Sequence, residues 1–340
     1  MKTFNLRNSV FILVSFFQTA VLQAADFQVA GTIKDRDTKQ AIPYVNIGIP
    51  GTSIGTASYE DGTFSLHIPD KYLKDTIYFS AIGYSLLKMP IQKFTQQEPI
   101  ILWMNKEAVQ LQEVVVRSKK GKSSKEKLLS QGLFIKRKSN SSTALSSKTG
   151  GAAMALMMNE KSQNLLLQSA TIYIHENELP EFKLRCRIVS VEEGLPGKDL
   201  LNENVIISSS IPNGLLSVNL SSYNLLIDKP FFLVFEWIVD KSLLDYYNYL
   251  ETHRPAWWPK GAGIENRKFV IEKDANGKEI KRVPMTKEQQ AEYEQIRLRT
   301  TYYATKGSPL KGYRRYSSMG NWEETTRDMV ASISYSLADH

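Results

Sequence analysis

Apolar and polar residues alternate in short runs through the first third of the chain, which is the pattern of half-buried β-strands. The runs are separated by turn residues, among them Gly51, Gly55, Asp61-Gly62 and Gly83. Several short strands with turn signals between them are typical of a sandwich. The runs begin at Phe27, Val45, Phe64, Ile77 and Ile100. The pattern therefore predicts an all-β sandwich over residues 25–117.

The same alternation returns at residue 144 and predicts a second β-sandwich over residues 144–340, for which a jelly-roll is one fitting topology. Cys186 is the single cysteine and falls on the apolar side of its run, so we expect a small buried hydrophobe and no disulfide. The expected strands lie at 171–174, 182–191, 205–207, 216–220, 231–237 and 329–335.

Residues 241–325 interrupt this second pattern and are predicted to be an elaborated loop. Asn276-Gly277 is a strong signal for a hairpin between its flanking residues. Thr286 and Gln289 have the spacing of a capping box, which predicts a polar helix running to Arg299. A helix and hairpin are therefore expected as an insertion in the second sandwich.

Between the two sandwiches, residues 118–143 are rich in Lys and Ser and carry eight basic side chains against one acid, Glu126. This segment accounts for most of the net charge of +8, so neither sandwich carries a basic surface and nucleic-acid binding is excluded. We interpret it as an extended linker with a short helix around Leu128-Leu129. A foothold on anionic lipid head groups is the alternative.

Residues 1–24 have the form of a signal peptide, with Lys2 and Arg7 before an apolar stretch at residues 10–17 and small residues at Ala24 and Ala25. The apolar stretch is shorter than the ~20 residues that a membrane span needs. We expect export to the periplasm or the outer membrane, with no transmembrane span after the signal is removed. An uncleaved anchor is the alternative.

A series of motifs in residues 25–117 resembles the carboxypeptidase regulatory-like domain of exported proteins of the Bacteroidetes type. The resemblance implies a seven-stranded, transthyretin-like Greek-key sandwich, and it implies no peptidase activity because the zinc-binding catalytic domain has no counterpart here. Residues 111–116 also resemble the segment that follows this domain in TonB-dependent receptors, but the remaining chain is too short for a 22-stranded barrel. The motifs, in order, are Gly31-Thr32-Ile33, Ala41 to Ile47, Gly55-Thr56, Glu60 to Leu66 and Ala81 to Tyr84.

The candidate contact residues are four aromatic side chains of the elaborated loop, Tyr246, Tyr247, Trp257 and Trp258. Flat rings with polar edges suit sugar rings and protein partners alike. The alternative is structural: the two tryptophans fix the loop onto the sandwich.

No motif in the sequence specifies a reaction. Gly51 to Gly55 matches G-x-S-x-G, but a strand is expected after it where a nucleophile elbow needs a helix. The histidines at 67, 175, 253 and 340 are scattered and have no metal-ligand spacing. We therefore expect no catalytic residues, no metal and no cofactor.

These observations predict a non-catalytic, exported cell-envelope protein that acts as an interaction or accessory module through its first sandwich. The expected partner is an envelope or outer-membrane protein. A carbohydrate-binding protein that uses the loop around Trp257-Trp258 is the alternative, and an unrecognised hydrolase is a weaker one.

Overall fold

The structure is a computed structural model, and the expectation of an all-β protein is confirmed. Strands make up most of the ordered elements, with two α-helices and three short 3-10 helices among the residues described. In that part of the chain, no helix has the length and apolar character needed to cross a membrane. The structure describes residues 27–94, 100–107, 127–131, 142–144, 150–159, 161–253, 255–258, 263–265, 268–274, 278–296, 300–306, 311–325 and 327–337.

Residues 27–107, the N-terminal unit, form seven strands in two sheets, as expected for the domain that the motifs resemble. The sheet orders are β4-β1-β7 and β3-β2-β5-β6, and β1 pairs with β7 in parallel. Alternate residues of β1 and β4 are buried between the sheets, where Phe64 packs edge-on against Phe79. The elements are β1 (Phe27–Asp35), β2 (Asn46–Gly48), β3 (Gly55–Ala57), β4 (Thr63–Ile68), η1 (Asp70–Tyr72), β5 (Thr76–Ser80), β6 (Leu87–Pro90), η2 (Ile91–Lys93) and β7 (Ile100–Met104).

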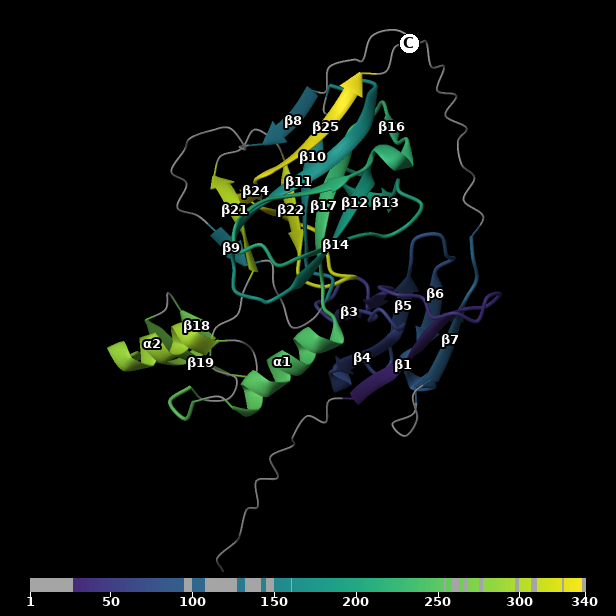
Figure 1. Cartoon of the computed structure of the whole chain (residues 1–340). Helices are drawn as coiled ribbons and strands as arrows, with labels where there is room; N and C mark the ends of the chain where they lie inside the picture. The colour runs from purple at the N-terminus through teal and green to yellow at the C-terminus, as the bar shows by residue number, and fades with distance from the viewer. Residues whose placement is uncertain are drawn as a thin grey trace, which may run out of the picture.

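Residues 127–337, the second unit, contain two larger sheets that pack face to face, with the N-terminal unit against one end (Figure 1). One sheet, which we name the inner sheet, has the order β13-β12-β17-β10-β22-β23, with β14 also pairing with β12. Its strands are β10 (Ala153–Met158), β12 (Phe182–Glu192), β13 (Leu195–Asp199), β14 (Val205–Ser209), β17 (Phe231–Ile238), β22 (Gly312–Arg315) and β23 (Glu323–Thr325).

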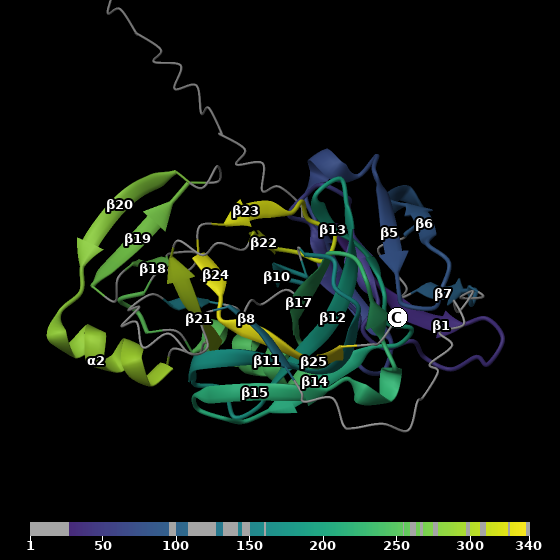
Figure 2. The ribbon, with the colours of Figure 1, turned by 90° about the horizontal axis from the view of Figure 1, so that it is seen from above.

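The other sheet of the second unit, the outer sheet, has the order β24-β21-β11-β25-β8. Two short strands also pair with β11 and one with β21. One of those that pair with β11, β15, lies beside it at the lower edge of the view in Figure 2. Its elements are β8 (Lys127–Gln131), β9 (Ser142–Ala144), β11 (Leu165–Asn177), β15 (Gly214–Asn219), η3 (Ser221–Tyr223), β16 (Leu226–Ile227), β21 (Thr300–Lys306), β24 (Arg327–Met329) and β25 (Ala331–Leu337).

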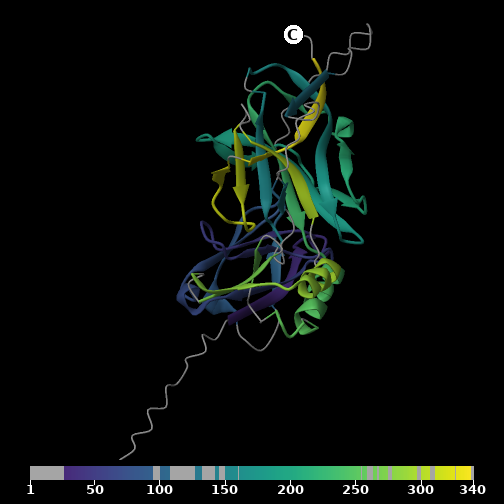
Figure 3. The ribbon, with the colours of Figure 1, turned by 90° about the vertical axis from the view of Figure 1, so that its left-hand side faces the viewer.

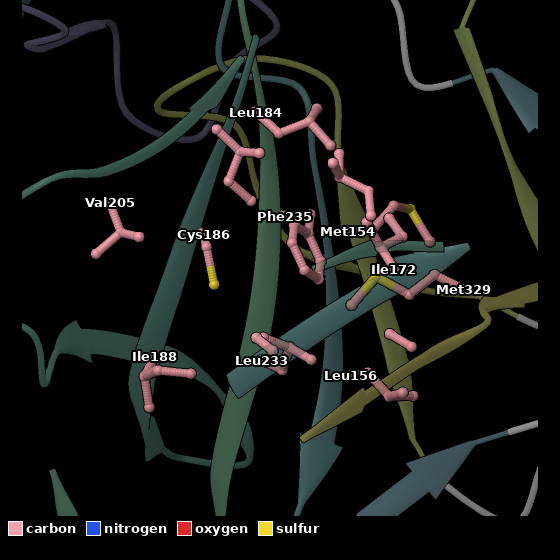
Figure 4. Packing of buried hydrophobic residues seen from close by; sticks show 14 of the residues in the cluster. Met154, Leu156, Ile172, Leu184, Cys186, Ile188, Val205, Leu233, Phe235 and Met329 are labelled. Atoms are coloured by element: carbon pink, nitrogen blue, oxygen red, sulfur yellow. The ribbon is translucent and has the colours of Figure 1, made fainter. Parts of the chain in front are cut away.

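The core of the second unit lies between these sheets and takes every other residue of each strand (Figure 4). Leu184, Cys186 and Ile188 point into this core, so Arg185 and Arg187 lie on the opposite face of β12. All eight residues of β17 are buried, which means that the opposite face of the inner sheet is covered as well. The N-terminal unit is part of that cover.

Part of the segment expected to be a linker belongs to the second unit. Residues 127–131 form β8, which pairs with β25, so the expected helix around Leu128-Leu129 is wrong. Leu128 is exposed while Leu129 packs on the core, the period-two pattern of a strand. The rest of the expected linker, apart from residues 142 and 143 in β9, lies outside the described residues, as does the expected signal peptide at 1–24.

The expected insertion is present, but it is shorter than 241–325. We name residues 241–296 the arm, because β21, β22 and β23 return to the sheets of the sandwich. The capping box is confirmed: the amide of Thr286 donates to Gln289 Oε1 at 2.9 Å, and the amide of Gln289 donates to Thr286 Oγ1 at 3.2 Å. The hairpin is also present, although its tip at 275–277 lies outside the described residues. The arm comprises α1 (Lys241–Thr252), β18 (Gly263–Glu265), β19 (Phe269–Lys273), β20 (Glu279–Pro284) and α2 (Lys287–Ile296) (Figure 3).

Candidate functional site

The two units meet at a tight contact that we call the seam, formed by Tyr44–Ala57 of the N-terminal unit with β12, Gly150-Gly151 and 317–321 of the second unit. The turn between β2 and β3 is hydrogen-bonded there: the amide of Gly51 donates to Met319 O at 3.0 Å. Ser317 Oγ donates to Thr52 O at 3.1 Å. The unit of β1–β7 is therefore fixed on the second unit along this turn (Figure 1).

Small residues allow the two backbones to approach. A side chain at Gly55 would come within 3.3 Å of Ser317 Cβ, and one at Gly150 would come within 3.3 Å of Ala57. Gly151 has φ +92°, and a Cβ atom there would overlap Ser318. The seam therefore depends on glycine at positions where another residue would force the units apart.

At the centre of the seam, Arg185 of β12 and Glu236 of β17 form a fully buried ion pair. Arg185 Nη2 donates to Glu236 Oε1 at 2.9 Å, and its Nε donates to Oε2 at 3.2 Å. The same guanidinium crosses to the N-terminal unit, where it donates to Tyr44 O at 2.7 Å and to Asn46 Oδ1 at 2.5 Å. One arginine thus ties both units together through a charge that water does not reach.

The backbone of Tyr44 is held in an unusual conformation by this contact. Its φ is +57°, in the left-handed region that bulky side chains seldom adopt. The carbonyl that results from this conformation accepts the hydrogen bond from Arg185. A strained backbone conformation persists only where the surrounding structure holds it in place, and at Tyr44 the second unit supplies part of that structure.

Two further arginines complete the buried cluster around Glu236. Arg187 contacts two carboxylates: its Nη1 lies 3.2 Å from Glu236 Oε2, and its Nε and Nη2 each lie 2.7 Å from an oxygen of Asp199. Arg315 contacts one, since its Nη2 lies 3.2 Å from Glu236 Oε1. Burial alone would raise the pKa of Glu236, but the three arginines outweigh it and lower the pKa to about 2. Burial lowers the pKa of Arg315 to about 10, with a contribution from the neighbouring Arg187 and Arg185 that Glu236 opposes.

Ion pairs closer to the surface border the seam on the side of α1. Lys183 Nζ lies 3.4 Å from Glu60 and 3.6 Å from Asp240, and Lys241 Nζ donates to Asp61 Oδ2 at 2.5 Å. Asp240 also caps α1, since its Oδ1 accepts from the amide of Leu243 at 2.9 Å. The hydrogen bond from Lys241 lowers the pKa of Asp61 to about 2.

The predicted contact residues fall into two separate groups. Trp257 and Trp258 stack at 6.1 Å between ring centroids and pack against Val270 and Met285 of the hairpin region. These described contacts join the two rings to the arm's own hairpin. The side chain of Tyr247 lies outside the described part of the chain.

Tyr246 belongs to a column of exposed rings along α1. Its ring lies 6.3 Å from that of Tyr249, which stacks on His253 at 4.0 Å with an interplanar angle of 22°. His253 Nδ1 lies 2.9 Å from Tyr249 O and 3.0 Å from Thr252 Oγ1, so the imidazole is held in place. Tyr246 and Tyr249 are 38% and 54% exposed, so this column is an aromatic surface that the arm presents to solvent.

The remaining sequence motifs lie in a turn and in the core. Gly51 to Gly55 is the turn between β2 and β3, as expected, and a strand follows it where a nucleophile elbow would have a helix. Burial raises the pKa of the Cys186 thiol to about 12, which leaves it protonated at neutral pH. Among the described residues, no three His, Cys, Asp or Glu side chains are grouped so as to hold a metal ion.

Sequence reasoning missed the charged cluster of the seam. The signal was present in two places: basic residues alternate with apolar ones in β12, and Glu236 is the one acid in an otherwise apolar strand. An acid inside a buried strand requires cationic partners nearby. The strand pattern alone does not say that Arg185, Arg187 and Arg315 provide them.

Comparison with known proteins identifies the first unit. Residues 29–116 match the family described as CarboxypepD_reg-like domain, and this part of the chain is a carboxypeptidase regulatory-like domain. No curated protein matches the chain. One similar solved structure contains the cysteine protease and lectin-like domains of Cwp84, a surface-layer-associated protein of Clostridium difficile. It is 12% identical with a TM-score of 0.28, and the match covers 92% of this chain but 59% of that one. This likeness carries no argument about function.

Proposed function

We propose that the protein is a non-catalytic, exported component of the cell envelope that binds another envelope protein through its carboxypeptidase regulatory-like domain. The observation that carries the proposal is the match of residues 29–116 to this domain, together with the way in which the domain is docked. Among the described residues, the hydrogen bonds from the domain to the second unit come from residues 44–61, so exposed side chains elsewhere on the domain can serve a partner.

The available surface includes the outer face of the β4-β1-β7 sheet. Ile101 of β7 is 50% exposed there, and Trp103 two residues on lies under the ammonium of Lys39. Leu86, between β5 and β6, is 48% exposed. Exposed aliphatic side chains on a rigid sheet are suited to contact with a protein.

The test is in-cell crosslinking of the tagged full-length chain, followed by purification from the envelope and mass spectrometry. We expect a stoichiometric envelope protein with the natural sequence and its loss in the Leu86→Ser/Ile101→Ser variant. The matched control is Leu215→Ser, an exposed leucine in β15 of the second unit, which should keep the partner. A partner retained by both variants would contradict binding through the first domain, and a chain that purifies alone would contradict the proposal as a whole.

Carbohydrate binding is the second candidate, and the ring column of α1 favours it. The rings of Tyr246, Tyr249 and His253 are exposed and follow one another along the helix, which also exposes the polar side chains of Asp245 and Asn248. Sugars combine apolar faces, which stack on aromatic rings, with hydroxyl groups that hydrogen-bond at the edges. This assigns glycan contact to the column instead of the Trp257-Trp258 pair.

A glycan array probed with the full chain tests this second candidate. Binding should be lost in Tyr246→Ala/Tyr249→Ala and kept in Leu215→Ser. Glycan binding that survives the tyrosine changes would move the site elsewhere, and an array without signal would leave protein binding as the sole candidate.

A further inference from the structure

The outer sheet carries a row of small polar side chains on the face that points away from the core. Ile172 of β11 points into the core, so its neighbours along the strand lie on the opposite face. On that face, Thr171 lies opposite Ser217 of β15, and Ser169 lies opposite Asn219. The two strands run side by side in Figure 2. We name Ser169, Thr171, Ser217 and Asn219 the polar face.

Among the described residues around the polar face, none is charged over three neighbouring strands. The strands lie in the order β15, β11 and β25. Charged side chains are the usual occupants of exposed positions, and β20 of the arm has three of them, Glu279, Lys281 and Arg282. The uncharged composition therefore distinguishes this face from an ordinary solvated one. Its outward residues are Leu166, Ser169, Thr171 and Tyr173 of β11, Leu215, Ser217 and Asn219 of β15, and Ser332, Ser334 and Ser336 of β25.

The polar groups of this face provide both hydrogen-bond donors and acceptors. Thr171 Oγ1 lies 2.7 Å from Ser217 Oγ, and Ser169 Oγ lies 2.6 Å from Ser334 Oγ. Each pair uses one hydroxyl hydrogen, so it keeps a second O–H donor and several acceptor lone pairs. Asn219 Oδ1 accepts two hydrogen bonds from within its own turn, at 2.8 and 2.7 Å, which leaves the Nδ2 group as the donor for a ligand.

We propose that the polar face binds an extended, uncharged polysaccharide. A sugar hydroxyl donates and accepts hydrogen bonds, as this face does, and it brings no charge that would need a counterion. Nucleic acid or anionic lipid would require cations, which the described residues of this face do not supply. Ser217 and Asn219 are exposed, while Ser169 and Thr171 are half-buried, so a ligand can reach the row.

The geometry of the sheet favours a polymer over a single sugar. Neighbouring strands lie ~4.8 Å apart, and residues on one face of a strand repeat every ~6.8 Å, so the polar groups form a flat grid. Contacts spread over such a grid are individually weak and hold a ligand only when many form together. This surface is separate from the first domain and from the ring column of α1, so the inference depends on neither of the contacts proposed above.

The test is cosedimentation of the full chain with insoluble cellulose, chitin and raw starch. Sodium chloride at about 0.5 M screens attraction that arises from the net charge of +8. We expect saturable binding to at least one of the three polymers. Ser217→Lys/Asn219→Lys should weaken this binding tenfold or more, because the polymer would cover two charges without partners. Leu195→Lys, which adds a charge to the exposed strand β13, should leave it unchanged, as should Tyr246→Ala/Tyr249→Ala.

Three results would overturn the proposal. They are the absence of binding to all three polymers, equal binding by Ser217→Lys/Asn219→Lys and the natural chain, and a loss of binding in the Leu195 or tyrosine variants that matches the loss in the double lysine variant.

A second pair of variants covers the case in which two lysines disturb β15. Ser217→Ala/Asn219→Ala removes polar groups without adding charge and should weaken binding by about threefold to tenfold. Ser217→Thr keeps the hydroxyl and should bind as the natural chain does. A Tm within about 2 °C of the natural value establishes that each variant is folded. Full binding by Ser217→Ala/Asn219→Ala would also contradict the proposal, as would an equal loss in Ser217→Thr.

Discussion

The seam and the arm both involve the second unit, but the seam buries its characteristic side chains and the arm exposes some of its own. The seam buries Arg185, Arg187, Arg315 and Glu236, so each charge depends on the others. The arm exposes Tyr246 and Tyr249 on α1, where neither ring is needed to fill a core. Removing a buried charge leaves its partners without compensation, whereas removing an exposed ring changes little but the surface. The difference predicts that changes in the seam alter stability far more than changes at the exposed rings of the arm.

The largest effect is expected from Glu236→Ala, because this change leaves three buried arginines around a missing carboxylate. We expect a loss of about 3–5 kcal/mol in the free energy of unfolding, measured with denaturant. Glu323→Ala is the control, since Glu323 is 57% exposed and lies 3.9 Å from Arg314; its effect should stay within about 0.5 kcal/mol. Similar values for the two variants would remove the distinction between buried and exposed charges on the second unit.

A dependence of stability on pH should come from the same carboxylate. The pKa of Glu236 is lowered from 4.5 to about 2 in the folded chain, so the folded state binds the proton less readily than the unfolded state. Its contribution is complete above pH 4.5 and is lost as the pH falls toward 2, by about 3 kcal/mol in all. Unfolding free energies of the natural chain and Glu236→Gln between pH 7 and pH 3 measure it as the difference in slope. Parallel slopes would show that Glu236 is not held ionised by the seam.

The next effect concerns how closely the units approach. Gly151→Ala places a Cβ atom against Ser318 at φ +92°, whereas Gly194→Ala adds one at φ +81° with no atom within 4 Å. The two changes share the cost of left-handed backbone, so their difference isolates the crowding at the seam. We expect Gly151→Ala to be less stable than Gly194→Ala by about 1–3 kcal/mol in denaturant unfolding. Equal losses would mean that the units adjust freely at this point.

Local patterns in the sequence were sufficient for the strands and for the start of α2. The alternation from Phe27 to Ile33 marks β1, and Thr286 with Gln289 forms the capping box that begins α2. Both signals act between residues a few positions apart. The same reasoning predicted a helix at Leu128-Leu129, where pairing with a distant strand, β25, produces β8. Long-range pairing overrides local preference there.

The candidate sites were harder to predict because they depend on what covers a surface. Alternation in β12 shows that Arg185 and Arg187 share one face, but not that the N-terminal unit covers it. Two adjacent tryptophans were expected to be a contact surface, yet Val270 and Met285 of the hairpin partly bury them. The exposed rings of Tyr249 and His253 come together only because α1 places them one turn apart. Composition identified the aromatic segment, while burial separated its packed rings from its exposed ones.

The smallest effect on stability is expected at the arm, and it is the sharpest test of the contrast with the seam. Tyr249→Ser should change the free energy of unfolding by no more than about 0.5 kcal/mol, because the ring is 54% exposed and its ring contacts, with Tyr246 and His253, are themselves at the surface. Trp258→Ala is the matched change in the same arm. It should loosen the packing on Val270 and Met285 and speed limited proteolysis between α1 and α2. If Tyr249→Ser destabilised the chain by more than about 1 kcal/mol, the ring column would be part of the fold. A neutral effect would show that the ring of Tyr249 does not stabilise the fold, as the proposed contact surface requires.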